Sequence, residues 1–161
     1  MTEKDIHSVR EVALASWGET YSALFPDEIL AEWFERNYSA PMLSKQLEKT
    51  KMFVIEEEQQ VVGFASFTKV DEDGDSELTA LHISPAHTQK GYGTSLVGKG
   101  IEELQKRGLH LYVYVESLNL AARAFYEKLG FHLLEEFDEY FEGYPTTTAQ
   151  YVLPLKTPTL I

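Results

Sequence analysis

Residues 81–101, LHISPAHTQKGYGTSLVGKGI, decide how this chain is interpreted, because a strand, a glycine-containing turn and a helix follow one another there. Apolar residues over Glu77–Ile83 are typical of a strand, which Pro85 ends. Apolar residues spaced for one helix face predict a helix over Gly91–Gly108. The turn that joins them reads Thr88-Gln89-Lys90-Gly91-Tyr92-Gly93-Thr94.

This turn has the features of an anion site. Backbone N–H groups can converge where a strand passes into a helix, glycine allows close approach, and the helix terminus carries roughly half a positive charge. A Gly-x-Gly pair alone is a weak signal that also fits an ordinary turn with a solvated lysine. Two other phosphate motifs are excluded: the third glycine of a dinucleotide fingerprint is missing, and Gly100 stands where a Walker loop has Ser or Thr.

The charges of the chain are unevenly distributed. It carries 26 Asp and Glu against 14 Lys and Arg, a net charge of −12, yet residues 78–101 contain no acid. Overall acidity opposes binding to nucleic acid or anionic membranes, so neither is expected as a partner, and it favours a cationic ligand or solubility alone.

Length and composition indicate a single globular α/β domain over residues 1–161, with a frayed tail at 156–161. The 161 residues are 43% hydrophobic, and they contain no cysteine, which removes thiol nucleophiles, thiolate metal sites and disulfides. No histidine spacing suggests a metal site. Without a signal pattern or an apolar run of membrane length, we expect a cytoplasmic protein. Either a monomer or a homodimer is expected, because an uncovered sheet edge can pair with a second chain.

Periodicity predicts alternating helices and strands. A helix begins at Ile6 and buries Val9, Val12, Ala13 and Trp17, and a second begins after Pro26. The remaining expected elements are a short helix over 44–51, a hairpin of 52–55 with 61–67, a strand over 110–115, a helix over 119–129 and closing strands over 131–134 and 151–155.

A second constellation lies in the helix after the strand over 110–115. Asn119 can cap the helix, and Tyr126 lies seven residues later, about two turns along nearly the same face. Taken alone, Asn119 could be only a helix N-cap and Tyr126 only a tyrosine of the core.

Together, the two segments resemble the GCN5-related N-acetyltransferase (GNAT) family, which uses acetyl-CoA. The resemblance covers residues 53–131 and is carried by the Leu81–Pro85 strand, the Gly91/Gly93 turn and the later signature of Asn119, Ala122, Phe125, Tyr126, Gly130 and Phe131. It implies a mixed, mostly antiparallel central sheet flanked by about four helices and splayed between its two middle strands. Because the first helix begins almost at once, the family's first strand is expected to be missing or supplied otherwise.

The resemblance also implies a coenzyme site. Backbone N–H groups of Gln89, Lys90, Gly91, Tyr92, Gly93 and Thr94 would hold the pyrophosphate, whereas Leu81, His82 and Ile83 would pair with the pantetheine arm. Asn119 and Tyr126 would also contact the coenzyme. Thr88 is also expected at the coenzyme site, but it stands where the family has Gln or Arg, so its side-chain contact to phosphate differs from the family's.

For the chemistry, the resemblance makes Tyr126 the general acid that protonates the departing thiolate. Glu77 is our candidate base, with His110 as an alternative. His82 lies five residues from Glu77, an odd number, so its side chain is expected on the opposite side of the strand.

The acceptor is expected to be a small cationic amine, a polyamine being one such molecule. The expected contacts are Tyr21 of the first helix and Tyr140 and Glu142 of the late acidic and aromatic segment, because carboxylates and ring faces both attract cations. Two other functions stay open: a protein or peptide N-acetyltransferase, and a non-catalytic acyl-CoA-binding module.

Overall fold

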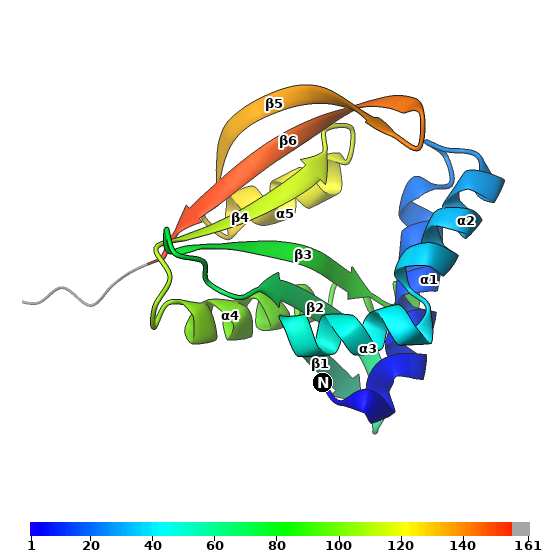
Figure 1. Cartoon of the computed structure of the whole chain (residues 1–161), viewed down its shortest axis with the longest axis horizontal. Helices are drawn as coiled ribbons and strands as arrows, with labels where there is room; N and C mark the ends of the chain where they lie inside the picture. The colour runs from blue at the N-terminus through cyan, green and yellow to red at the C-terminus, as the bar shows by residue number, and fades with distance from the viewer. Residues whose placement is uncertain (156–161) are drawn as a thin grey trace, which may run out of the picture. The chain divides into compact units, whose positions relative to one another are not determined.

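The computed structural model describes residues 1–155, so the tail at 156–161 lies outside the described residues. The strands are ordered β1-β2-β3-β4-β6-β5 in a mixed sheet whose β3–β4 pair is parallel (Figure 1). This confirms the expected α/β class, and residues 1–155 contain five α-helices where about four were expected. The elements are α1 (Ile6–Tyr21), α2 (Asp27–Asn37), α3 (Ala40–Lys49), β1 (Thr50–Glu57), β2 (Gln60–Thr68), β3 (Asp75–Ile83), α4 (Tyr92–Leu104), β4 (His110–Glu116), α5 (Leu120–Lys128), β5 (His132–Phe141) and β6 (Tyr144–Pro154).

The described chain forms two compact units. Unit 1 comprises residues 1–67 and 80–100, and unit 2 comprises residues 68–79 and 101 onward. The strand β3 therefore contributes its first half to unit 2 and its second half to unit 1. In residues 1–155 no strand precedes α1, as expected, and no helix is both long and apolar enough to cross a membrane.

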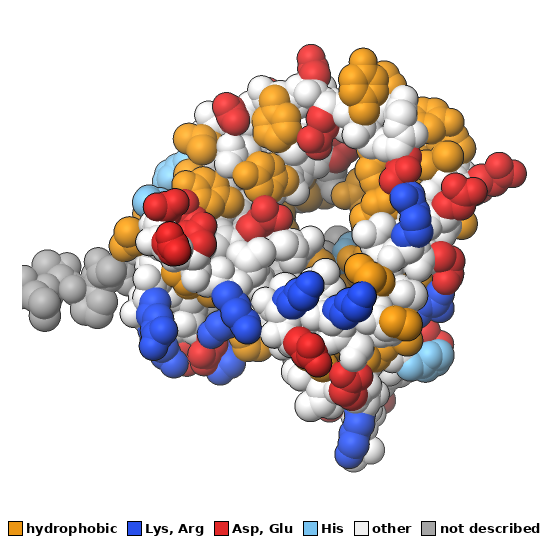
Figure 2. Space-filling view, in the orientation of Figure 1, with side chains coloured by type: hydrophobic (Ala, Val, Ile, Leu, Met, Phe, Trp, Pro, Cys, Tyr) orange, Lys and Arg blue, Asp and Glu red, His pale blue; other side chains and the backbone are white. Residues whose placement is uncertain are grey.

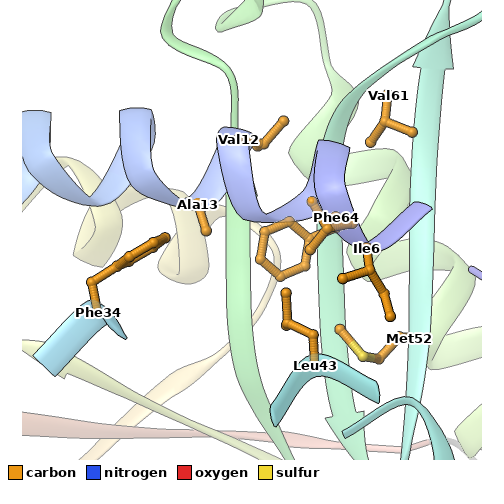
Figure 3. Close-up of a cluster of buried hydrophobic side chains, with 9 residues drawn as sticks. Ile6, Val12, Ala13, Phe34, Leu43, Met52, Val61 and Phe64 are labelled. Carbon is orange, nitrogen blue, oxygen red and sulfur yellow. The ribbon is translucent and has the colours of Figure 1, made fainter. Parts of the chain in front are cut away.

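The core of unit 1 forms where three helices pack on β1 and β2. The spacing predicted for α1 is confirmed, because Ile6, Val9, Val12, Ala13 and Trp17 are its buried residues. Phe34 of α2 and Leu43 of α3 point toward Phe64 of β2 in this core (Figure 3).

The opposite face of β2 is covered by α4. Phe67 lies three residues after Phe64, so its side chain leaves the other face of the strand, and it is fully buried. Its ring lies so close to Gly100 that a Cβ built on this glycine would lie 2.1 Å from the nearest ring carbon. Glycine at this position therefore sets how closely α4 approaches the sheet.

Unit 2 is a sheet with α5 on one face. The parallel register of β3 with β4 consists of four pairs, from Asp75↔His110 to Leu78↔Val113, whereas β4 pairs with β6 along its whole length. Tyr151 of β6 is fully buried, accepts a hydrogen bond from Arg123 of α5 (2.9 Å) and donates one to Glu127 (3.0 Å). These bonds fix α5 against the face of the sheet that carries Tyr151.

Several expected boundaries were wrong. The third helix begins at Ala40 rather than residue 44, because Ser39 caps it and Pro41 occupies its first turn. The helix predicted to reach Gly108 ends at Leu104. The two closing strands are 10 and 11 residues long rather than short, because β5 is a mostly exposed edge strand that lacks an apolar alternation and is held by its pairing with β6.

Substituting the two glycines of α4 tests the close packing on Phe67. Gly100→Ala should lower the free energy of unfolding by about 1–3 kcal/mol, because its methyl group overlaps the Phe67 ring. Gly98→Ala, whose Cβ meets no atom within 4 Å, should raise it by about 0.5–1 kcal/mol through helix propensity. Urea unfolding measures both, and equal effects of the two substitutions would contradict this packing.

Candidate active site

The expected anion-binding turn, residues 88–94, is called the glycine loop here. Gln89 and Gly91 both adopt left-handed conformations, with φ of 63° and 81°, on either side of Lys90. The helix α4 starts at Tyr92, and the N–H of Ser95 bonds to the carbonyl of Gly91 (3.0 Å). The N–H groups of Tyr92, Gly93 and Thr94 thus belong to the helix end that has no intrahelical acceptors, which is the geometry of an anion site.

Three side chains of the glycine loop bond to other parts of the protein. The Thr88 hydroxyl donates a hydrogen bond to the Pro85 carbonyl (3.3 Å), which ties the loop to the preceding turn. Lys90 and Tyr92 both contact Glu57 at the end of β1. Sequence analysis missed Glu57 because it lies more than 30 residues before the loop.

The second half of β3, with Leu81, His82 and Ile83, is half-buried in unit 1. His82 lies with its Nδ1 3.1 Å from the Ser16 hydroxyl of α1 and its ring against Phe64, and burial lowers its pKa to about 4. Its imidazole is therefore neutral and packs against the core residue Phe64, so only the backbone of His82 is a candidate for coenzyme pairing.

In unit 2, Glu77 lines a cavity of about 430 Å³. Burial raises the pKa of its carboxyl above the ordinary value, which suits a group that must accept a proton. The register pairs Glu77 with Tyr112, so the two side chains share a face of the sheet. The cavity is lined by Thr68, Asp71, Asp75, Ser76, Glu77, Tyr112, Tyr114, Leu134 and Gln150.

The cavity is acidic and aromatic. Figure 2 shows acidic side chains gathered over the turn that joins β2 to β3, the turn that supplies Asp71. Tyr114 accepts a hydrogen bond from the Gln150 amide (3.0 Å), and burial together with the Glu77 charge raises the pKa of its phenol. Neither Tyr112 nor Tyr114 was predicted as a site residue. The alternation of β4 was the available signal, because it places the two side chains on one face of the strand.

His110, the alternative base, lies 3.3 Å from Asp75 through its Nδ1. It pairs with Asp75 in the register and does not line the cavity that contains Glu77. Geometry therefore favours Glu77 over His110 as the group that meets a molecule in this cavity.

The side chain of Asn119 accepts a hydrogen bond from the N–H of Ala122 (3.1 Å) and so caps α5. Tyr126 is 7% exposed and packs on Phe125 and Phe131. Asn119 is thus an N-cap and Tyr126 is a core tyrosine, the two structural roles that the sequence allowed.

Glu77 and α5 lie on opposite faces of the unit 2 sheet. Leu78, Val113 and Tyr151 are register partners and share one face, which is the face that α5 covers. Glu77 precedes Leu78, so its side chain points to the other face.

The expected acceptor contacts fall in different units. Tyr140 is 76% exposed near the end of β5, and Glu142 has a φ of 48° in the turn that follows. Tyr21 ends α1 in unit 1, with its ring 4.7 Å from that of Trp17. Within residues 1–155, no group of three or more His, Asp or Glu side chains could hold a metal ion.

Comparison with known proteins identifies the family. The sequence pattern that defines the acetyltransferase (GNAT) family matches residues 6–131. The chain is 26% identical over 135 residues to a spermidine N(1)-acetyltransferase of Thermoplasma acidophilum, an alignment covering 80% of this chain and 83% of that one. It is 33% identical over 116 residues to the [ribosomal protein bS18]-alanine N-acetyltransferase of Escherichia coli, covering 71% and 72%.

The fold agrees with this match. The crystal structure of the PaiA N-acetyltransferase from Thermoplasma acidophilum in complex with coenzyme A superposes with a TM-score of 0.79 at 23% identity, covering 92% of this chain and 94% of that one. The chain therefore belongs to the GNAT family of acetyltransferases, as the resemblance implied.

Replacing Glu77 tests whether its burial is unfavourable to the fold. A raised carboxyl pKa means that ionisation opposes folding at every pH above both the folded and the unfolded pKa. Glu77→Gln should therefore raise the melting temperature at about pH 7, and the gain should vanish near about pH 3, which lies below the carboxyl pKa of both the unfolded and the folded state.

Glu72→Gln, which removes an exposed carboxylate from the same unit, controls for the loss of one charge. Thermal unfolding at the two pH values decides the matter. A lower melting temperature of Glu77→Gln at neutral pH would contradict this view of the site.

Proposed function

We propose that the chain transfers an acetyl group from acetyl-CoA to a small cationic amine. The observation that carries this proposal is the cavity where Glu77 meets two further carboxylates and two tyrosines, on the face of the unit 2 sheet opposite α5. Membership in the GNAT family supports the reaction class.

The glycine loop is suited to the diphosphate of the coenzyme. Its left-handed residues turn the chain so that the first amides of α4 face outward from the helix end, and the helix dipole adds positive potential there. The backbone of Leu81–Ile83 would pair with the pantetheine arm, and Asn119 would contact the coenzyme. A PaiA N-acetyltransferase of similar fold binds coenzyme A, which supports this assignment.

Two side chains are assigned to proton transfer. Acetyl-CoA supplies the thioester, and an attacking amine must first lose a proton. Glu77, whose carboxyl pKa is raised by burial, would accept that proton directly or through water. Tyr126, held by Phe125 and Phe131, would donate its hydroxyl proton to the thiolate that leaves.

The cavity favours a cationic acceptor. Asp71, Asp75 and Glu77 bring negative charge to it, and Tyr112 and Tyr114 add aromatic faces that attract cations. The net charge of −12 also favours a cationic ligand. One relative of the chain acetylates spermidine, which is a polyamine. Tyr21, Tyr140 and Glu142 would contribute further acceptor contacts, and a polyamine is the leading acceptor.

A peptide N-terminus is the second candidate acceptor. The observation in its favour is the 33% identity to an enzyme that acetylates the alanine of a ribosomal protein. The three carboxylates of the cavity favour a small amine with several positive charges over a peptide N-terminus, which carries one.

Acetylation of a panel of acceptors tests the substrate class. Spermidine, an amino sugar, a lysine peptide and an alanine-terminated peptide would each be offered with acetyl-CoA. We expect kcat/KM to be highest for spermidine by at least about tenfold, the effect of 1.4 kcal/mol of differential binding. A peptide acceptor at the top of the panel would contradict the preference for a small cation.

Removing the Tyr126 hydroxyl tests the general acid. Tyr126→Phe should lower kcat by about 10²- to 10⁴-fold, because the leaving thiolate loses its proton donor. Calorimetric titration should show nearly unchanged binding of coenzyme A. An unchanged kcat would remove Tyr126 from the mechanism.

A further inference from the structure

The carboxylate of Glu57 contacts two residues of the glycine loop. The Lys90 ammonium lies 3.1 and 3.2 Å from its two oxygens, and the Tyr92 hydroxyl donates a hydrogen bond to it. The Nε2 atom of His87 lies 4.0 Å from the same carboxylate. All of these residues belong to unit 1.

The fold therefore places the carboxylate of Glu57 against residues 78–101, a segment that contains no Asp or Glu of its own. The hydrogen bond from Tyr92 and that from Lys90 hold the pKa of the Glu57 carboxyl below its usual value, so it is ionised at neutral pH. Lys90 is the lysine of the glycine loop, and its charge is already matched by this carboxylate.

The contact also spans the part of the loop that is suited to an anion. Lys90 precedes Gly91 and Tyr92 follows it, so one carboxylate holds the loop on both sides of the glycine from which α4 begins. A phosphate bound to the first amides of α4 and the Glu57 carboxylate would be two anions competing for one ammonium.

We propose that Glu57 sets the affinity of this protein for the phosphates of its coenzyme. In the free protein it is the counter-anion of Lys90, and the coenzyme diphosphate displaces it from the ammonium. The inference rests on the proposed function, because it takes the glycine loop as the diphosphate site.

The test is calorimetric titration of coenzyme A into the wild type, Glu57→Gln and the matched control Glu56→Gln. Glutamine keeps the size of the side chain and an oxygen that can accept from Tyr92. Glu56 is an exposed neighbour whose side chain points to the other face of β1, so its substitution removes the same charge without the contact.

Glu57→Gln should bind coenzyme A about two- to fivefold more tightly than Glu56→Gln at low salt, the scale of an exposed ion pair. The difference should shrink near 1 M salt, where the Debye length is about 3 Å. Lys90→Met should weaken binding less in the wild type than in Glu57→Gln, because only the wild-type lysine must leave a partner.

A readout in the unmodified protein complements the variants. Carbon NMR of the Glu57 carboxyl should show its pKa rising when coenzyme A is added, since it then loses Lys90 and gains a neighbouring anion. Binding in all three proteins with equal or weaker affinity in Glu57→Gln, or an unmoved Glu57 pKa, would overturn the inference alone. Absence of binding in all three would overturn the proposed function as well.

Discussion

Four residue pairs between β3 and β4 are the constraint on which the candidate active site depends. The parallel register from Asp75↔His110 to Leu78↔Val113 fixes which side chains share a face. It turns Leu78 toward the face covered by α5 and Glu77 toward the cavity, because neighbouring residues of a strand point to opposite faces. A shift by a single residue would exchange the two and place a carboxylate in the core.

Electrostatics are organised by the fold rather than by the sequence alone. The acidic turn before β3 and Glu77 concentrate negative charge at one cavity of unit 2. In unit 1, the glycine loop offers helix amides to an anion, while Glu57 balances the only lysine in the loop. The chain thus carries a cavity lined by carboxylates in unit 2 and an unpaired helix N-terminus at the glycine loop in unit 1.

Much of this could be predicted from local patterns. The helical spacing of Ile6, Val9, Val12, Ala13 and Trp17 gave the buried face of α1, and the glycine loop lies between β3 and α4 as predicted. The length of β5 could not be predicted, because an exposed edge strand is held by its neighbour and shows no apolar alternation. The pairs Glu57–Lys90 and Tyr114–Gln150 join residues more than 30 positions apart, which no local pattern encodes.

We propose that Glu77 takes the proton of the acceptor amine and that Tyr126 gives its proton to the leaving sulfur, both at the thioester carbon to which the two atoms are bonded in the transition state. A crystal structure with a bisubstrate analogue, in which coenzyme A is joined to a polyamine through an acetyl bridge, tests it most directly. The Glu77 carboxylate should lie about 3 Å from the acceptor nitrogen, directly or through one water, and the Tyr126 hydroxyl should lie within hydrogen-bond reach of the sulfur. An acceptor nitrogen remote from Glu77, or a sulfur remote from Tyr126, would contradict the account.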